Sequence, residues 1–250
     1  FSPEILASIK RPGPLLITKT DIRSNVHRMT HMDYVGVKRY RADGAVIGER
    51  RFVGLFTSGA YNKAPSDIPV LRRKAALTIA RAGFARDSHD GKALQNILDT
   101  YPRDELFQTS RELLFHNSMA ILRLLERPRT RLITRLDPFE RYVSCLVYIP
   151  REHFHADVQN KISGILSAAY EGSVAAQQPE YGDAPLARIH CIIKTSPGAL
   201  PKVDLEQLEQ QVDRATRSWG DDLHDALLAL KGGENGLQLW GRYAQAFPQS

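Results

Sequence analysis

The sequence predicts an α+β fold in which antiparallel β-sheets are joined by a run of helices. Two strand-like runs meet at Asp43-Gly44, the kind of dipeptide that a tight β-hairpin needs. Apolar residues recur every three and four positions between residues 65 and 127, as on amphipathic helices. From Arg141 to Arg217 the pattern predicts strand, helix, strand, strand and helix, and residues 131–136 supply one more strand. That order is typical of a ferredoxin-like sandwich, in which helices cover one face of an antiparallel sheet.

Length and composition are those of a globular protein. The chain has 250 residues, of which 42% are hydrophobic and 25% charged, so it has room for one large or two ordinary domains. Its net charge of +6 is a weak signal for nucleic-acid binding, because acids are interspersed with the bases. Two local basic clusters are Lys38, Arg39, Arg41, Arg50 and Arg51, and Arg127, Arg129, Arg131 and Arg135.

The first region, residues 1–60, is predicted to be rich in strands. An apolar-to-polar run follows a Pro-Gly-Pro turn and predicts a strand over residues 14–20. In the hairpin, the alternation of Val35 and Val37, and then of Phe52 with Leu55 or Phe56, predicts one packed face and one wet face. We interpret this region as the C-terminal part of a sheet module that lacks its own beginning.

The middle region, residues 61–129, is predicted to be a helical connector. One helix begins at Pro65 and stops at Gly83, since glycine is favoured just past a helix end. The last helix is predicted to begin at Thr109, whose hydroxyl would form a capping box with Glu112.

Between these helices lies a stretch of chemistry-bearing residues, His89-Asp90-Gly91-Lys92. A phosphate-binding loop would need Gly-x-x-x-x-Gly-Lys-Ser/Thr, but alanine follows this lysine and no glycine stands at the upstream position. We interpret the stretch as a helix start, with Asp87, Ser88 or Asp90 as its cap. Pro102 is predicted to begin the next turn, and Arg103 with its neighbouring acids to serve a packed joint between sheet modules.

The last region, residues 130–220, is predicted to contain the complete βαββα module, and residues 221–250 the start of a following helical region. Gly232-Gly233 separates two helices there, and the second is expected to find its partners beyond Ser250. The expected elements of the module after its first two strands are a helix over 155–172, strands over 173–181 and 186–195 joined by the turn Gly182-Asp183-Ala184-Pro185, and a helix after Pro201.

The sequence carries no motif for catalysis, for a cofactor or for a metal ion. Dinucleotide binding needs G-x-G-x-x-G directly after a strand, whereas the densest glycine cluster here, Gly232-Gly233-Gly236, follows a helix. The histidine pairs His27/His31 and His153/His155 have no third ligand at metal-site spacing. We therefore expect no catalytic, cofactor-binding or metal-binding residue in this chain, and we expect a binding or regulatory role.

Two cysteines, Cys145 and Cys191, lie in apolar runs that predict buried strands. Without a disulfide framework or a CxxC pair, they favour a cytoplasmic location. No run is long enough to span a bilayer, and the first residues form no signal peptide. Because the sequence does not begin with methionine, we expect it to be a piece of a longer protein.

Long blocks of the sequence, in series over essentially the whole chain, resemble the N-terminal regulatory half of the large bacterial NAD-specific glutamate dehydrogenases. The blocks are "VHRMTHMDYVGVKRY", "GERRFVGLFTSGAYNKAPSDIPVLRRK", "SHDGKALQNILDTYPRDELFQ", "DPFERYVSCLVYIPRE", "PLARIHCIIKTSPG", "SWGDDLHDAL" and "GRYAQAFP".

This resemblance implies ACT-type modules and helical linkers that precede a catalytic half, which oxidises L-glutamate to 2-oxoglutarate and ammonia with NAD. Residues 1–60 would end one ACT-like module, 61–129 would form the connector, 130–220 a further ACT-like module and 221–250 the next helical region. The segment itself would hold no cofactor, and NAD and the catalytic residues would belong to the catalytic half. The implied partners are that catalytic half, further copies in a homo-oligomer and an amino-acid effector, with no membrane.

Two alternatives remain open. The ACT loop that binds amino acids commonly carries a glycine after the first strand, but "YIPREHFHAD" has none, so a purely architectural role is an equal reading. The sequence also leaves three environments open for Arg188 and His190 on their strand, namely a ligand, a neighbouring subunit or water. From another class, a basic nucleic-acid-binding module is the alternative, because ferredoxin-like sheets also host RNA readers; "RFVGLF" is a poor match to their aromatic strand.

Overall fold

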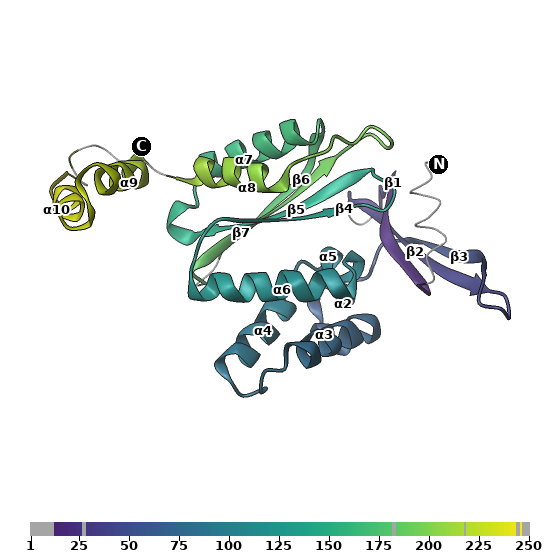
Figure 1. The fold of residues 1–250 in the computed structure, drawn as a ribbon. Helices are drawn as coiled ribbons and strands as arrows, with labels where there is room; N and C mark the ends of the chain where they lie inside the picture. The colour runs from purple at the N-terminus through teal and green to yellow at the C-terminus, as the bar shows by residue number, and fades with distance from the viewer. Residues whose placement is uncertain (1–12, 27–28, 182–183, 218, 244–245, 247–250) are drawn as a thin grey trace. The chain divides into compact units, whose positions relative to one another are not determined.

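The computed structural model describes residues 13–26, 29–181, 184–217, 219–243 and 246 (Figure 1). The chain divides into two compact units. The first comprises Phe1–Arg127, Ile133–Ser144 and Lys194–Leu200, and the second comprises Pro128–Leu132, Cys145–Ile193 and Pro201–Ser250. Helices and antiparallel sheets both occur, so the α+β prediction is confirmed.

A three-stranded antiparallel sheet opens the first unit. Its strands are β1 (Leu15–Arg23), β2 (His31–Tyr40) and β3 (Val46–Gly54), in the order β1-β2-β3. The hairpin predicted at Asp43-Gly44 is present, and Gly44 takes a φ of 85°, a left-handed value that suits glycine. The prediction of one packed hairpin face is wrong, because the Phe52 side chain is 58% exposed.

A run of helices follows this sheet in the first unit. They are α2 (Ser58–Asn62), the 3-10 turn η1 (Pro65–Asp67), α3 (Pro69–Ala82), α4 (His89–Thr100), α5 (Arg103–Gln108) and α6 (Arg111–Glu126). Their core is made by leucines with no exposed surface, namely Leu71, Leu94, Leu98, Leu106 and Leu114. Gly83 ends α3 with a φ of 72°, which confirms the predicted stop. The predicted start at Pro65 is wrong, because Pro65–Asp67 form a separate 3-10 turn and α3 begins at Pro69.

The start of α6 differs from the prediction by one residue. Ser110, not Thr109, is its N-cap, and the Ser110 Oγ atom accepts a hydrogen bond from the Leu113 N–H at 3.2 Å. Thr109 instead ends α5, and its N–H donates to the Glu105 carbonyl at 2.8 Å. With Ser110 as the cap, the third position of the helix is Leu113 and not Glu112, so the predicted capping box does not form.

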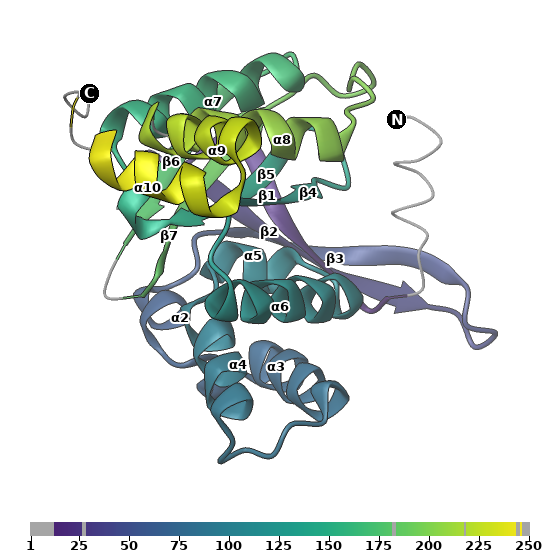
Figure 2. The same cartoon turned by 60° about the vertical axis from the view of Figure 1, so that its left-hand side comes forward.

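The second sheet carries the predicted βαββα order with one strand added. Its strands lie in the order β4-β5-β7-β6, and α7 and α8 pack against each other (Figure 2). Cys145 and Cys191, on the two central strands, are fully buried free thiols, as predicted. The elements are β4 (Arg131–Leu136), β5 (Tyr142–Pro150), η2 (Arg151–His153), α7 (Ala156–Ala169), β6 (Ser173–Glu180), β7 (Leu186–Lys194) and α8 (Leu205–Thr216).

Two further helices, α9 (Trp219–Lys231) and α10 (Gly233–Tyr243), end the described chain and pack against each other. Gly232 separates them with a φ of 76°, as expected for the glycine pair. The turn predicted at Gly182-Asp183 lies outside the described residues. In the described part of the chain, no helix is both long and apolar enough to span a bilayer.

Candidate functional site

A buried ion pair joins α5 to β4 in the first unit. The Arg135 guanidinium donates from Nε to Glu105 Oε2 at 2.7 Å and from Nη2 to Glu105 Oε1 at 2.6 Å. Glu105 is 2% exposed and Arg135 is 8% exposed. Burial opposes the charge on Arg135, but the Glu105 carboxylate raises the guanidinium pKa above its ordinary value. Both groups are therefore charged, and each depends on the other, because an unpaired buried charge is strongly unfavourable.

Uncharged polar groups extend this pair towards β1. Gln108 Oε1 accepts hydrogen bonds from Arg135 Nη2 at 3.2 Å and from the Tyr142 hydroxyl at 2.5 Å. The Tyr142 hydroxyl lies 3.1 Å from Thr18 Oγ1, which donates to Asp137 Oδ1 at 2.7 Å. We call these residues, together with Glu105 and Arg141, the polar junction.

Asp137 holds the turn between β4 and β5 inside this junction. Its carboxylate is fully buried and accepts from Arg141 Nε at 2.8 Å and from the Phe139 N–H at 3.1 Å. The same turn places Glu140 at a φ of 56°, and its Oε2 atom accepts from the Gly198 N–H at 2.8 Å. The turn is thus fixed both to β1 and to the segment that follows β7.

Lys74 of α3 supports the junction from the other end of α5. Its Nζ atom donates to the carbonyl oxygens of Leu106 at 2.7 Å, Phe107 at 3.0 Å and Thr109 at 2.7 Å. These carbonyls lie at or just past the end of α5, where backbone oxygens lack partners within the helix. Burial lowers the pKa of Lys74 to about 8, and the nearby Arg135 charge adds to this effect.

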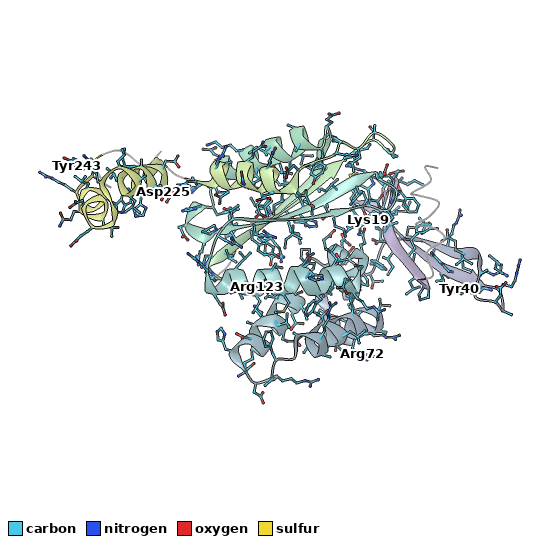
Figure 3. All side chains as sticks on the ribbon, in the orientation of Figure 1. Lys19, Tyr40, Arg72, Arg123, Asp225 and Tyr243 are labelled. Atoms are coloured by element: carbon cyan, nitrogen blue, oxygen red, sulfur yellow. The ribbon has the colours of Figure 1, made fainter. Side chains whose placement is uncertain are left out.

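A second lysine with little exposed surface is Lys19 of β1, which Figure 3 labels. Its Nζ atom is 2.6 Å from Asp33 Oδ1 and 3.1 Å from Asp104 Oδ1, and the Tyr61 hydroxyl donates to Asp104 at 2.9 Å. Burial opposes the lysine charge, but Asp104 and Asp33 raise its pKa above the ordinary value. This cluster and the polar junction both connect α5 with the three-stranded sheet.

In the junction and in the Lys19 cluster, each acid lies against a base within the same unit. These ion pairs hold α5, β1, β2 and the turn between β4 and β5 together. Among the described residues, no group of three or more His, Cys, Asp and Glu side chains is arranged to hold a metal ion.

The stretch His89-Asp90-Gly91-Lys92 begins α4, as predicted. Ser88 is its N-cap, and the Ser88 Oγ atom accepts from the Gly91 N–H at 3.0 Å. His89 is exposed, and its ring lies 3.4 Å from Asp90. Gly91 is needed for space, because a Cβ atom there would lie 2.2 Å from the Ala85 carbonyl oxygen.

In the second unit, a shallow depression lies where the chain enters α7. It is lined by Arg151, Phe154, His155, Ala156, Gln159, Pro179 and Tyr181. The rings of Phe154 and Tyr181 pack against each other in this lining, with their centroids 5.2 Å apart. His155 is the N-cap residue of α7 but makes no side-chain capping bond. Arg151, Phe154, His155 and Ala156 belong to the glycine-free loop "YIPREHFHAD". This loop therefore lines the depression with aromatic and basic groups.

The other residues that the sequence analysis named do not come together in one site. Arg188 and His190 are both 9% exposed, and Arg188 forms an ion pair with Glu180, so both belong to the packed sheet. His153 lies 3.5 Å from Asp221. His31 contacts the Thr20 carbonyl through Nδ1, and His27 lies outside the described residues.

Sequence reasoning did not find the polar junction. Its members are separated by up to 124 residues, and no local spacing marks them. The available signal was the turn at Asp137-Pro138 with Arg141 four residues after the aspartate, which is the spacing of the observed ion pair.

Two family models match the chain. Residues 68–127 match the glutamate dehydrogenase helical motif 1, and residues 131–220 match the glutamate dehydrogenase ACT2 domain. The first range covers α3 to α6, and the second begins with β4 and extends past α8.

Three curated relatives are NAD-specific glutamate dehydrogenases. The protein of Halomonas elongata is 36% identical and that of Pseudomonas aeruginosa 35% identical, each over 97% of this chain. The protein of Mycobacterium tuberculosis is 30% identical over 86% of the chain. The chain spans only about 15% of the length of these relatives. This chain therefore belongs to the NAD-specific glutamate dehydrogenase family, of which it carries the helical motif 1 and the ACT2 domain.

Proposed function

We propose that this chain is a non-catalytic regulatory and oligomerisation segment of an NAD-dependent glutamate dehydrogenase. The parent reaction would convert L-glutamate, NAD and water into 2-oxoglutarate, ammonia and NADH. The observation that carries the proposal is the polar junction. In it the buried charged groups of the connector and of the ACT2 strands are paired with one another, which is an arrangement that positions elements.

The partners follow from this assignment. The catalytic half of the same chain would bind NAD and glutamate, and the segment itself would hold no cofactor. Further copies would assemble through it into a homo-oligomer in the cytoplasm. An amino-acid effector would enter the depression at the start of α7, where Arg151 could hold a carboxylate and the Phe154 and Tyr181 rings an aliphatic chain.

An activity assay tests the non-catalytic role. The 250-residue chain, mixed with L-glutamate and NAD, is expected to form no NADH above the blank. Glutamate-dependent NADH formation by this chain would show that the assignment is wrong.

Calorimetry tests the effector role separately. Aspartate, arginine and glutamate are titrated into the chain, and binding heat that disappears in Arg151→Ala would support a sensor at the depression. Arg81→Ala is the matched control, because Arg81 is an exposed arginine of the first unit paired only on the surface. The absence of heat with all three, while the chain still self-associates, would favour the architectural role.

A further inference from the structure

The outer edge of β3 is unpaired. In the order β1-β2-β3, strand β3 pairs with β2 on one side, and within the described ranges no strand lies on its other side (Figures 1 and 2). An open edge presents backbone N–H and C=O groups that can pair with another chain. The edge is nine residues long and contains no proline that would block pairing.

The side chains of β3 are also open to solvent. Ile47, Phe52 and Val53 are each more than half exposed, at 52%, 58% and 53%. An apolar, unpaired edge strand is a site for association unless something covers it.

The sequence of β3 is complementary to itself when two copies run antiparallel. With Arg50 opposite Arg50, the strand Val-Ile-Gly-Glu-Arg-Arg-Phe-Val-Gly places Glu49 opposite Arg51, Gly48 opposite Phe52 and Ile47 opposite Val53. Directly opposed residues in an antiparallel pair lie on the same face. Each copy would therefore find an opposite charge, an apolar side chain and a glycine that an aromatic ring can cover.

The charges favour this register over its neighbours. Glu49 and Arg51 already form an ion pair within one strand, with Nε to Oε1 at 3.0 Å, and the Tyr34 hydroxyl donates to Glu49. A second copy would add the reciprocal pair, so that each glutamate lies between two arginines. Opposed residues must point to the same face, so the pairing can only shift by two residues. That shift would place Glu49 opposite Glu49 or Arg51 opposite Arg51, and both attractive pairs would be lost. The single like-charge contact at Arg50 is outweighed by two attractive pairs of similar size.

We propose that β3 pairs antiparallel with β3 of a second copy of this chain, with Arg50 on the two-fold axis, to give a six-stranded sheet. This interface would be one of the contacts of the oligomerisation role proposed above.

Charge reversal tests the pairing. Arg51→Glu opposes Glu49 to a glutamate, and Glu49→Arg opposes Arg51 to an arginine, so each variant alone should lose self-association that light scattering detects for the native chain. An equimolar mixture should form heterodimers, because residues 49 and 51 of one variant again face opposite charges at residues 51 and 49 of the other. Native-like self-association of either folded variant alone, or a mixture of two folded variants that stays monomeric, would overturn the proposal.

Cysteine cross-linking tests the register and does not disturb the Glu49 contacts. Opposed residues of an antiparallel pair have Cα atoms about 4.5–5.5 Å apart, which suits a disulfide. Under mild oxidation Arg50→Cys should convert the 28.1 kDa chain to a disulfide-linked species of twice that mass. Val53→Cys is the matched control, since residue 53 would lie about 20 Å from its counterpart at ~3.4 Å per residue. The native thiols Cys145 and Cys191 are fully buried.

The results separate this interface from the broader function. A native chain that dimerises while Arg50→Cys fails to cross-link, or cross-links no faster than Val53→Cys, would refute β3 pairing and leave an oligomerisation role through another surface. A native chain that stays monomeric at every concentration measured would refute the pairing too. Glutamate-dependent NADH formation would refute the non-catalytic role and leave the pairing intact.

Discussion

Two arginines of the first unit, Arg135 and Arg141, pair with buried carboxylates. Arg135 binds Glu105 in a bidentate geometry, and Arg141 binds Asp137 four residues earlier. In a low-dielectric interior such pairs gain little over apolar residues of the same volume, but the loss of one partner leaves a charge without water or counter-charge. These residues therefore specify which elements meet more than they add net stability.

Glu105→Gln is expected to destabilise the chain by about 3–5 kcal/mol, because it leaves the buried Arg135 charge opposite a neutral amide. Urea unfolding followed by circular dichroism would measure the loss. Glu112→Gln is the matched control, since Glu112 pairs with Arg81 in an exposed position, and its midpoint should not change. The double variant Glu105→Leu with Arg135→Met should regain most of the stability, because it removes both buried charges. Equal urea midpoints for Glu105→Gln and the native chain would contradict the prediction.

Gly91→Ala is expected to destabilise the chain by about 1–3 kcal/mol, because the new methyl group would overlap the Ala85 carbonyl oxygen at 2.2 Å. Gly164→Ala provides the opposite result in another helix. Gly164 is exposed in α7 with open space around it, and alanine there should stabilise by about 0.5–1 kcal/mol through helix propensity. Thermal unfolding of both variants measures the two signs, and a Gly91→Ala variant as stable as the native chain would show that the turn can shift.

At the scale of elements, the sequence predicted the helix ends whose signals are local and not those whose support is distant. The stop of α3 follows from Gly83 and the start of α4 from Ser88, whereas α3 begins at Pro69 and not at the predicted Pro65. Helix α5 has only six residues, and Lys74 donates hydrogen bonds to the carbonyls at its end. Lys74 precedes Thr109, the furthest of these residues, by 35 positions. Local signals therefore predicted only a turn beginning at Pro102 and assigned the cap of α6 to Thr109.

Lys74 is expected to make stability depend on pH in an alkaline window. Burial lowers its pKa from 10.5 to about 8, so the folded chain releases this proton at lower pH than the unfolded chain does. Between about pH 8 and 10.5 the unfolded chain binds more protons at this position, and the free energy of unfolding rises with pH through this group. Below pH 8 both states are charged, and the contribution is constant.

Lys74→Met removes this titration and the three hydrogen bonds at the end of α5. The variant should be less stable than the native chain at pH 7, and the difference should widen by at most about 3 kcal/mol towards pH 10. Urea unfolding of both proteins at several pH values measures the two slopes. Parallel stability curves from pH 7 to 10 would contradict the lowered pKa.

At the scale of the whole molecule, the matched domains and the compact units have different limits. The ACT2 match covers residues 131–220, but residues 133–144 and 194–200 group with the connector and the three-stranded sheet. The sequence could predict the order of elements, because strands, turns and helices have local signatures. It could not predict this grouping, because Thr18, Glu105 and Tyr142 become neighbours only in the folded chain.

The grouping predicts that the ACT2 domain depends on residues outside its own boundaries. Excised as residues 131–220, it would lack Glu105, Gln108 and Thr18, which bind Arg135, Tyr142 and Asp137 in the chain. Its urea midpoint should therefore lie below that of the same strands in the 250-residue chain, as followed by hydrogen exchange of the β4 amides.

Arg135→Met separates this cause from a general effect of truncation. In the 250-residue chain the substitution leaves the buried Glu105 carboxylate without its partner and should cost about 3–5 kcal/mol. In residues 131–220 that carboxylate is absent, so the same substitution should change the midpoint little. Because the two measurements differ only in the presence of the partner, their difference isolates the coupling between Arg135 and the connector. Equal losses in both contexts would mean that Arg135 acts within the ACT2 domain alone and that the polar junction does not tie this domain to α5.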